Sequence, residues 1–390
     1  MHFDLGPTIC FMGVTGSHAY GMARATSDVD VRGCCIPPKA VRNSPFKTFD
    51  QFTHSAKAGR PPIGEKWDVM DAALRKHASA KDFWEKNNDE VDLEIDAIGK
   101  LVKLMADANP NKLELLFLDA DDILHMTDAW ATLRACRDLF LSTKVKFTYA
   151  GYAHSQLKRI KGHRAWLMDP PKVEPKRSDF DLPESTVLSA DDRNRLDEAI
   201  RKIIRDWGVE DGLDEYIKGA AQDVLRERMI DFQSTVLRCE DSLLDEKVYD
   251  LAAASVGLSK DVLYALKMER KYRGARKTWE QYKRWERERN EKRAALEAAH
   301  GFDTKHGAHL IRLLRTGLEI LKGKGLQVKR PDASDLLAIR DGAYSYDDLL
   351  AEAEKLDGQM NEAYKNSALP KKPDTEAIER IYLEILDRHG

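Results

Sequence analysis

The strand-like part of the hydrophobic pattern lies within the first 125 residues. Residues 8–14 form a short apolar, β-branched run that ends in a glycine-containing turn, as a buried strand does. Residues 28–36 begin with polar/apolar alternation and stop before Pro37 and Pro38. Residues 91–95 alternate again and lead into a helical period over 96–106. After the break at Asn109-Pro110, residues 112–117 also favour a helix. These patterns predict an α/β region at the start of the chain.

Beyond residue 125 the apolar positions recur almost entirely with helical spacing. Residues 169–188 interrupt this pattern because they are rich in proline and charge, which is typical of an exposed linker. We therefore predict an α+β fold: a small mixed sheet with flanking helices over 1–125, and a larger, mainly α-helical domain over 126–390. The expected helices of the second domain cover 191–207, 215–238, 260–270, 278–300, 305–321, 346–365 and 374–388.

Composition narrows the class of protein. The chain has 390 residues, of which 42% are hydrophobic and 33% charged, with a net charge of only -3. A nucleic-acid partner would therefore need a local basic surface, since the chain has no overall basic excess. The sequence lacks both a long apolar segment and a signal region, so we expect a cytoplasmic protein that does not enter a membrane. The five scattered cysteines include no CxxC pair beside a histidine, which predicts reduced thiols and disfavours a zinc site.

The strongest chemical signal is Gly16-Ser17 followed by Asp28 and Asp30. Residues two apart in a strand project from the same face, so the two carboxylates lie close together and repel each other unless a cation separates them. Magnesium suits such a site, because it takes oxygen ligands and is usually shared with substrate phosphates. The glycine allows close approach of a phosphate, and the serine can hydrogen-bond to it. This pattern predicts phosphoryl or nucleotidyl transfer.

The same arrangement resembles the signature of the DNA polymerase beta-type nucleotidyltransferase superfamily. The resemblance implies that Ser17 helps to hold a triphosphate, while Asp28 and Asp30 bind two magnesium ions, or manganese in their place. It also implies a third carboxylate on a neighbouring strand, which completes one metal site and deprotonates the attacking hydroxyl. Residues 91–95 are the candidate strand, and the two-residue period alone leaves Asp92, Glu94 and Asp96 open.

A second signal is the predicted helix over residues 305–321. At about 100° per residue, Lys305, His309 and Arg312 fall on one stripe opposite a leucine face, which suits a triphosphate or a nucleic-acid backbone. Residues 301–315, 330–332 and 337–342, together with 109–117, resemble the nucleotidyltransferase family associated with RNA-repair operons. That resemblance implies an aspartate at position 92 and a nucleotide-binding role for this helix.

Residues 270–293 are a third feature, in which lysines and arginines outnumber glutamates and aromatic residues are interleaved. Cations for phosphates and aromatic rings for stacking would serve a single-stranded or tRNA-like partner. The alternative is that the aromatic residues pack in a core and the charges form its solvated side. A second basic segment lies at 149–159. The residues predicted to contact nucleic acid are Lys158, Arg159, Arg276, Lys277, Lys283 and Arg284.

These features predict an enzyme that transfers a nucleoside monophosphate from a nucleoside triphosphate to an acceptor hydroxyl and releases pyrophosphate. The family resemblance favours the end of an RNA as acceptor. Transfer to a protein hydroxyl is the second hypothesis, and a non-catalytic nucleotide- or RNA-binding protein is the third. The third is disfavoured because a retired site has no physical reason to keep two repelling carboxylates.

Overall fold

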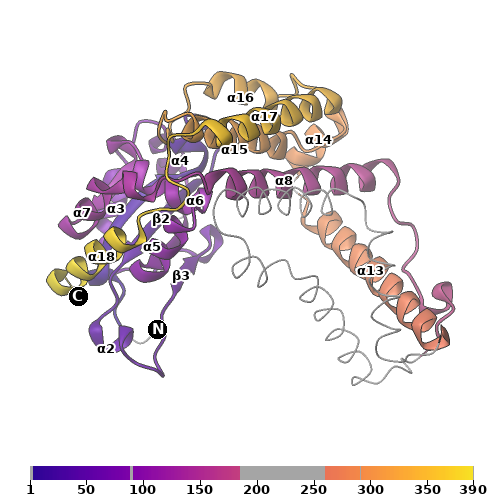
Figure 1. Cartoon of the computed structure of the whole chain (residues 1–390), viewed down its shortest axis with the longest axis horizontal. Helices are drawn as coiled ribbons and strands as arrows, with labels where there is room; N and C mark the ends of the chain where they lie inside the picture. Colours follow the sequence, from indigo (N-terminus) through magenta and orange to yellow (C-terminus); the bar gives the residue numbers. More distant parts are fainter. Residues whose placement is uncertain (1–2, 88–90, 185–259, 290, 390) are drawn as a thin grey trace, which may run out of the picture. The chain divides into compact units, whose positions relative to one another are not determined.

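The computed structural model describes residues 3–87, 91–184, 260–289 and 291–389 (Figure 1). Its contacts divide the chain into two compact units. The first unit combines Met1–Met168 with Asn290–Gly390, and the second is Asp169–Arg289. This division differs from the one expected near residue 125, because helices on both sides of that residue share one hydrophobic core. The helices predicted at 191–207 and 215–238 lie outside the described residues.

A five-stranded mixed sheet is the framework of the first unit, in the order β3-β4-β2-β1-β5. The central pair β2 and β4 is parallel, whereas every other neighbouring pair is antiparallel. The strands predicted from the alternation at 8–14, 28–36 and 91–95 are β1, β2 and β4. The strands are β1 (Ile9–Thr15), β2 (Val29–Cys35), β3 (Gln51–His54), β4 (Val91–Ala97) and β5 (Ile123–Met126).

Helices cover both faces of this sheet, as the predicted mixed sheet with flanking helices requires. On one face, Val31 and Leu93 pack with residues of α3 (Lys66–Leu74) and α4 (Lys81–Lys86). The other face packs against a larger core that extends into the C-terminal helices. The remaining short helices of the N-terminal region are α1 (Gly16–Ala19), α2 (Lys39–Arg42), α5 (Ile98–Ala106), α6 (Pro110–Leu113) and α7 (Asp128–Ala135).

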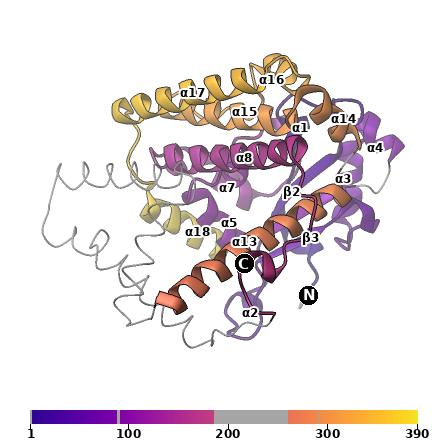
Figure 2. The ribbon, with the colours of Figure 1, turned by 90° about the vertical axis from the view of Figure 1, so that its right-hand side faces the viewer.

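The C-terminal helices of the first unit pack against the long helix α8 (Val145–Met168). In both views α15 (Thr304–Leu321) and α17 (Tyr346–Asn366) lie along α8 (Figures 1 and 2). Phe11 of β1, Tyr149 of α8 and Leu314 of α15 belong to one buried cluster. The other helices of this group are α14 (Glu291–His300), α16 (Ala333–Arg340) and α18 (Thr375–His389).

The second unit contains α13 (Lys260–Glu288), which joins the helix predicted at 260–270 to the first part of the one predicted at 278–300. The last part of that second prediction is a separate helix, α14, which begins at Glu291. Gly274 lies in the middle of this helix and did not end it. A charged pair links α13 to the preceding segment, since Arg177 donates to Glu269 at 2.7 and 3.1 Å. Residues 169–184, the described part of the exposed linker predicted at 169–188, contain one short 3-10 helix, Arg177–Phe180.

Some elements differ from the sequence-based expectation. The helix expected at 112–117 is a short α-helix, α6, followed by a 3-10 turn over Glu114–Phe117. The strand β3 and the helices α3 and α4 were not predicted, although the buried residues of α3, Trp67, Met70 and Leu74, follow helical spacing. No helix among the described residues is long and apolar enough to cross a membrane.

Candidate active site

The sheet topology brings Gly16-Ser17 and the predicted carboxylates to the same edge. Strand β1 ends at Thr15, and it is antiparallel to β2, so its end lies beside the start of β2. Strand β4 runs parallel to β2, and Asp92 pairs in register with Asp30. Asp28 comes directly before β2, where it is exposed. Asp30 and Asp92 are 62 positions apart in the sequence, and the parallel pairing of β2 with β4 brings them side by side. The antiparallel pairing of β1 with β2 brings the end of β1 to the same edge.

Gly16 is in close contact with one of these carboxylates. Its φ is +66°, a left-handed conformation that favours glycine. A Cβ atom at this position would lie only 2.6 Å from the Asp30 carboxylate oxygen Oδ2. The neighbouring Thr15 hydroxyl donates to the Asp30 backbone carbonyl at 3.3 Å. The glycine therefore serves two needs, the turn after β1 and the space for the Asp30 side chain.

We predict that Gly16→Ala lowers kcat/KM for nucleotide transfer by about 10²-fold, because a displaced carboxylate no longer meets its ligand correctly. Gly21→Ala is the matched control, since Gly21 has a similar φ of +71°. A Cβ on Gly21 would meet only ordinary contacts, the closest being Ala333 Cβ at 3.7 Å. Both variants should lose about 1 kcal/mol of unfolding free energy through backbone strain. Steady-state kinetics and urea unfolding check this, and equal activity losses in the two variants would contradict it.

The electrostatics of Asp30 show a concentration of negative charge. Burial raises the pKa of Asp30 to about 6, with the positive charge of Arg32 opposing this shift and the carboxylates of Asp28 and Asp92 adding to it. The positive charge of Lys305, on α15, also lowers the Asp30 pKa. The donors at this edge are carboxylate oxygens, which are the ligands that magnesium prefers. The residues present therefore fit a divalent cation.

Arg32 is a component of the site that the sequence pattern did not single out. Its guanidinium lies between two carboxylates, with Nη2 3.8 Å from Asp30 Oδ1 and Nε 3.5 Å from Glu94 Oε2. It also donates to the backbone carbonyl of Asp92 at 3.3 Å. Arg32 of β2 therefore supplies a positive charge among the carboxylates of this face of the sheet.

The three candidates for the third carboxylate have different surroundings. Asp92 is aligned with Asp30 and accepts a hydrogen bond from the backbone N–H of Ala56 at 2.9 Å. Glu94 and Asp96 instead share the ammonium group of Lys112, at 2.7 and 2.6 Å. Asp96 is also fully buried and bound by Lys100 at 2.8 Å. Among the three, Asp92 is the one that these lysines do not bind.

Ser17 and the neighbouring His18 lie on α1, immediately after β1. Ser17 is half-buried, and its backbone carbonyl accepts from the N–H of Met22 at 2.8 Å. The buried His18 connects this turn to the segment before Asp28, with Nε2 3.4 Å from the Ser27 carbonyl. Its Nδ1 lies 3.0 Å from the hydroxyl of Ser79. Burial lowers the pKa of His18, so the ring is a neutral hydrogen-bonding group in the wall of the site.

The predicted stripe on α15 does not share one environment. Lys305 is exposed, in the first turn of the helix, whereas Arg312 is buried. The Arg312 guanidinium lies over the Tyr20 ring at 3.8 Å and 3.7 Å from the Glu114 carboxylate. It also approaches His309, with Nη2 3.2 Å from the imidazole Nδ1. The stripe is thus exposed at Lys305, in the first turn of α15, and buried at Arg312, which interacts with Glu114 and His309.

His309 is expected to make stability depend on pH. Burial lowers its pKa to about 2, and the nearby charges of Arg312, His306, Lys305 and Arg159 act in the same direction. A depressed histidine pKa stabilises the fold fully above the unfolded value of 6.5 and loses that contribution as the pH falls. We predict that unfolding in urea at pH 5.5 costs about 1.4 kcal/mol less than at pH 7.5 on this account.

The variant His309→Gln should remove most of this difference, because an amide oxygen can accept from Arg312 without titrating. His154→Gln is the control, since His154 is exposed on α8. An unchanged pH dependence in His309→Gln would show that other groups cause it.

The residues predicted to contact nucleic acid lie in both units. Lys158 and Arg159 are exposed on α8 in the first unit. Four others are exposed on α13 in the second unit, namely Arg276, Lys277, Lys283 and Arg284. Beside them the rings of Trp279, Tyr282 and Trp285 follow each other with centroids 6.0 Å apart.

A mixed sheet that presents a glycine-serine turn and paired carboxylates at one edge is the arrangement of polymerase beta-type nucleotidyltransferases. Comparison with known families supports this class directly. Residues 4–168 match the model of the RNA repair pathway DNA polymerase beta family, so this part of the chain is similar to that family. The resemblance inferred from the sequence is therefore confirmed over this region. Searches of curated proteins and of solved structures gave no match.

Proposed function

We propose that this chain is a magnesium-dependent nucleotidyltransferase that attaches a nucleoside monophosphate, from ATP or another nucleoside triphosphate, to the end of an RNA. The observation that carries the proposal is the meeting of Asp28, Asp30 and Asp92 beside Gly16-Ser17 at one sheet edge. Two magnesium ions held there would neutralise the triphosphate and stabilise the attacking and leaving oxygens. Manganese offers the same coordination chemistry.

The protein residues have separate roles in this proposal. Asp28 and Asp30 hold the metal ions, and Asp92 completes one site and assists removal of the proton from the acceptor hydroxyl. The Ser17 hydroxyl and the N–H groups of its turn donate to the terminal phosphates. Lys305 supplies positive charge from α15, since its charge already acts on Asp30. We further propose that helices of the first unit after residue 125, among them α8 and α15, close this side of the site, with His309 and Arg312 supporting nucleotide binding.

The RNA acceptor is supported by two facts. The family description places its members in RNA repair, and exposed cations lie on α8 and α13, with aromatic rings beside those of α13. Cations and stacking rings together bind single-stranded nucleic acid with little sequence preference. The competing acceptor is a protein hydroxyl.

One labelling experiment tests the reaction and the acceptor together. The protein is incubated with magnesium, total RNA and each α-³²P-labelled nucleoside triphosphate, and RNA and protein are then separated under denaturing conditions. We expect label in RNA that ribonuclease removes and protease does not. Label in protein alone would replace RNA by a protein acceptor, and no transfer with any nucleotide would overturn the proposed reaction. The cofactor arm replaces magnesium with EDTA, which should stop the transfer.

The assignment of the third carboxylate has its own test. Asp92→Asn should lower kcat by at least about 10²-fold and raise the magnesium concentration needed for half-maximal activity, because a metal ligand is lost. Glu94→Gln removes a carboxylate from the same strand face but one that Lys112 binds, so its effect on kcat should stay within about tenfold. An equal decrease of kcat in both variants, or a larger decrease in Glu94→Gln, would show that Asp92 is not the third metal-binding carboxylate.

A further inference from the structure

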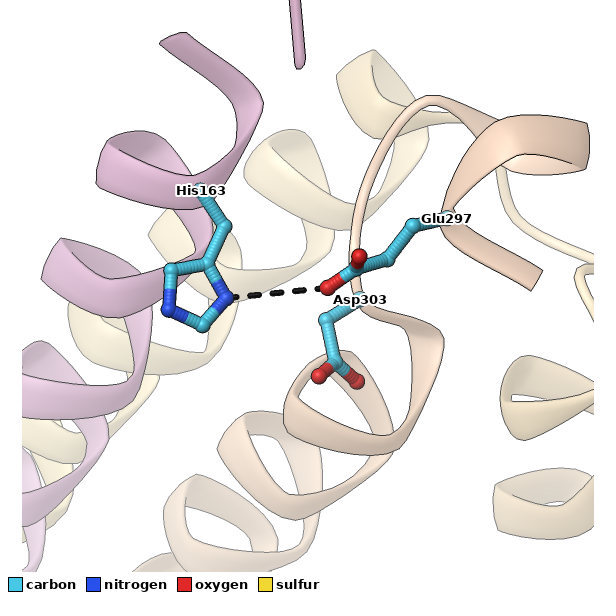
Figure 3. Close-up of side chains that lie close together, drawn as sticks. All are labelled: His163, Glu297 and Asp303. Carbon is cyan, nitrogen blue, oxygen red and sulfur yellow. Dashed lines mark ion pairs between the residues drawn. The ribbon is translucent and has the colours of Figure 1, made fainter. Parts of the chain in front are cut away.

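A second cluster of metal-binding side chains lies at a different place in the first unit, and Figure 3 shows it in close-up. His163 projects from α8, Glu297 from α14, and Asp303 from the turn before α15. One potential ligand atom from each residue lies within 4.8 Å of the other two. The imidazole Nδ1 of His163 is 3.6 Å from Glu297 Oε1.

The burial of this cluster makes it unusual. The side chains of Glu297 and Asp303 are 2% and 4% exposed, and that of His163 is 19% exposed. Two desolvated carboxylates at this separation carry a large electrostatic cost unless positive charge compensates them. A metal ion bound between them would supply such a positive charge.

The residues behind the cluster hold it in position. Asp303 caps α15, because its Oδ1 accepts from the backbone N–H of His306 at 3.0 Å. The His306 ring has its Nδ1 2.9 Å from the side-chain amide oxygen Oε1 of Gln156 and its Nε2 3.6 Å from Asp303 Oδ2. Ring stacking with Trp166 orients His163. Fixed second partners of this kind are typical of metal ligands.

We propose that His163, Glu297 and Asp303 bind a divalent transition-metal ion of the zinc class. An imidazole nitrogen with two carboxylates suits zinc better than magnesium, which prefers oxygen ligands alone. The site is thus chemically distinct from the carboxylate edge of the sheet, and the proposal does not depend on nucleotidyl transfer. No spacing pattern in the sequence reveals it, because the three ligands come from three separate elements.

The position of the cluster indicates a structural role. His163 is five residues before Met168, where the chain leaves the first unit, and α14 begins directly after Asn290, where the chain returns. A metal ion bound to both helices would join the two chain segments that flank the second unit. It would thereby stabilise α14, which packs against α15 in the same unit.

Metal binding to the full chain tests the proposal. After treatment with a chelator, the protein is dialysed against zinc in the presence of excess magnesium, and bound zinc is measured by mass spectrometry. Cobalt titration, followed by visible absorption, reports the coordination geometry of the bound ion. We expect one zinc per chain, retained in Asp28→Asn/Asp30→Asn, and a thermal midpoint raised by several degrees.

Three single variants identify the ligands. Glu297→Gln and His163→Gln should each weaken zinc binding at least about 100-fold, and Asp303→Asn should do so while keeping the helix cap, since asparagine also caps helices. His154→Gln, on the exposed side of α8, should bind zinc as the wild type does. Failure of the wild type to bind zinc, or equal binding in all variants, would overturn the proposal. Loss of zinc in Asp28→Asn/Asp30→Asn alone would assign the metal to the other site.

Discussion

Replacing both Asp28 and Asp30 by asparagine should reduce nucleotidyl transfer by about 10³-fold or more while the protein stays folded. The expected size follows from the several kcal/mol that metal ions contribute to the transition state, at tenfold per 1.4 kcal/mol. Stability should not fall, because burial and the carboxylates of Asp28 and Asp92 already make the charged form of Asp30 unfavourable. Asparagine keeps the shape of the side chain without its charge.

Single-turnover assays with labelled nucleotide and urea unfolding measure the two halves of this prediction. Asp68→Asn is the matched control, since Asp68 is an exposed aspartate on α3 that pairs only with Arg60 among the described residues. Its transfer rate and unfolding free energy should match those of the wild type. Robust activity in the double variant would overturn the proposed metal site. If the double variant is inactive because it is unfolded, the kcat values of Asp92→Asn and Glu94→Gln decide whether the metal site is correct.

The candidate site was predictable where its residues are close in sequence. Gly16-Ser17 and Asp28-x-Asp30 lie within fifteen residues, so the turn and the two-residue period of a strand were enough to group them. The choice of Asp92 over Glu94 depends on strand register and on Lys112, which lies on another element. The local periodicity of a sequence predicts neither the register between two strands nor an ion pair with a residue on another element. The sequence favoured Asp92 only through the resemblance to a family.

For α15, too, the sequence predicted the helix itself but not which of its polar side chains are buried. Periodicity predicted the extent of α15 to within one residue, since the helix is Thr304–Leu321. It could not show that Arg312 of this helix is buried, because its partners Glu114 and Tyr20 lie 198 and 292 residues away in the sequence. A polar stripe commonly marks the solvated face of a helix. Here Arg312 is only 4% exposed.

Arg312 is therefore expected to contribute strongly to stability. Its guanidinium lies near Glu114, over Tyr20 and beside His309, all within the protein interior. Burial raises the pKa of Glu114, while Arg312 and the Tyr20 hydroxyl lower it, so removal of the guanidinium leaves a carboxylate that is costly to ionise. Breaking a buried pair in this way typically costs about 3–5 kcal/mol. We predict a loss of this size in the unfolding free energy of Arg312→Met.

A double-mutant cycle with Glu114→Gln separates this role from nucleotide binding. Arg312→Met/Glu114→Gln should recover much of the lost stability, because it no longer buries an unpaired charge. Lys322→Met, at an exposed position after the same helix, should change stability by less than about 0.5 kcal/mol. If Arg312 instead serves mainly as a nucleotide ligand, Arg312→Met will unfold like the wild type and show a raised KM for the nucleoside triphosphate. The double variant thus tests whether the charge on α15 supports the wall of the site or contacts the substrate.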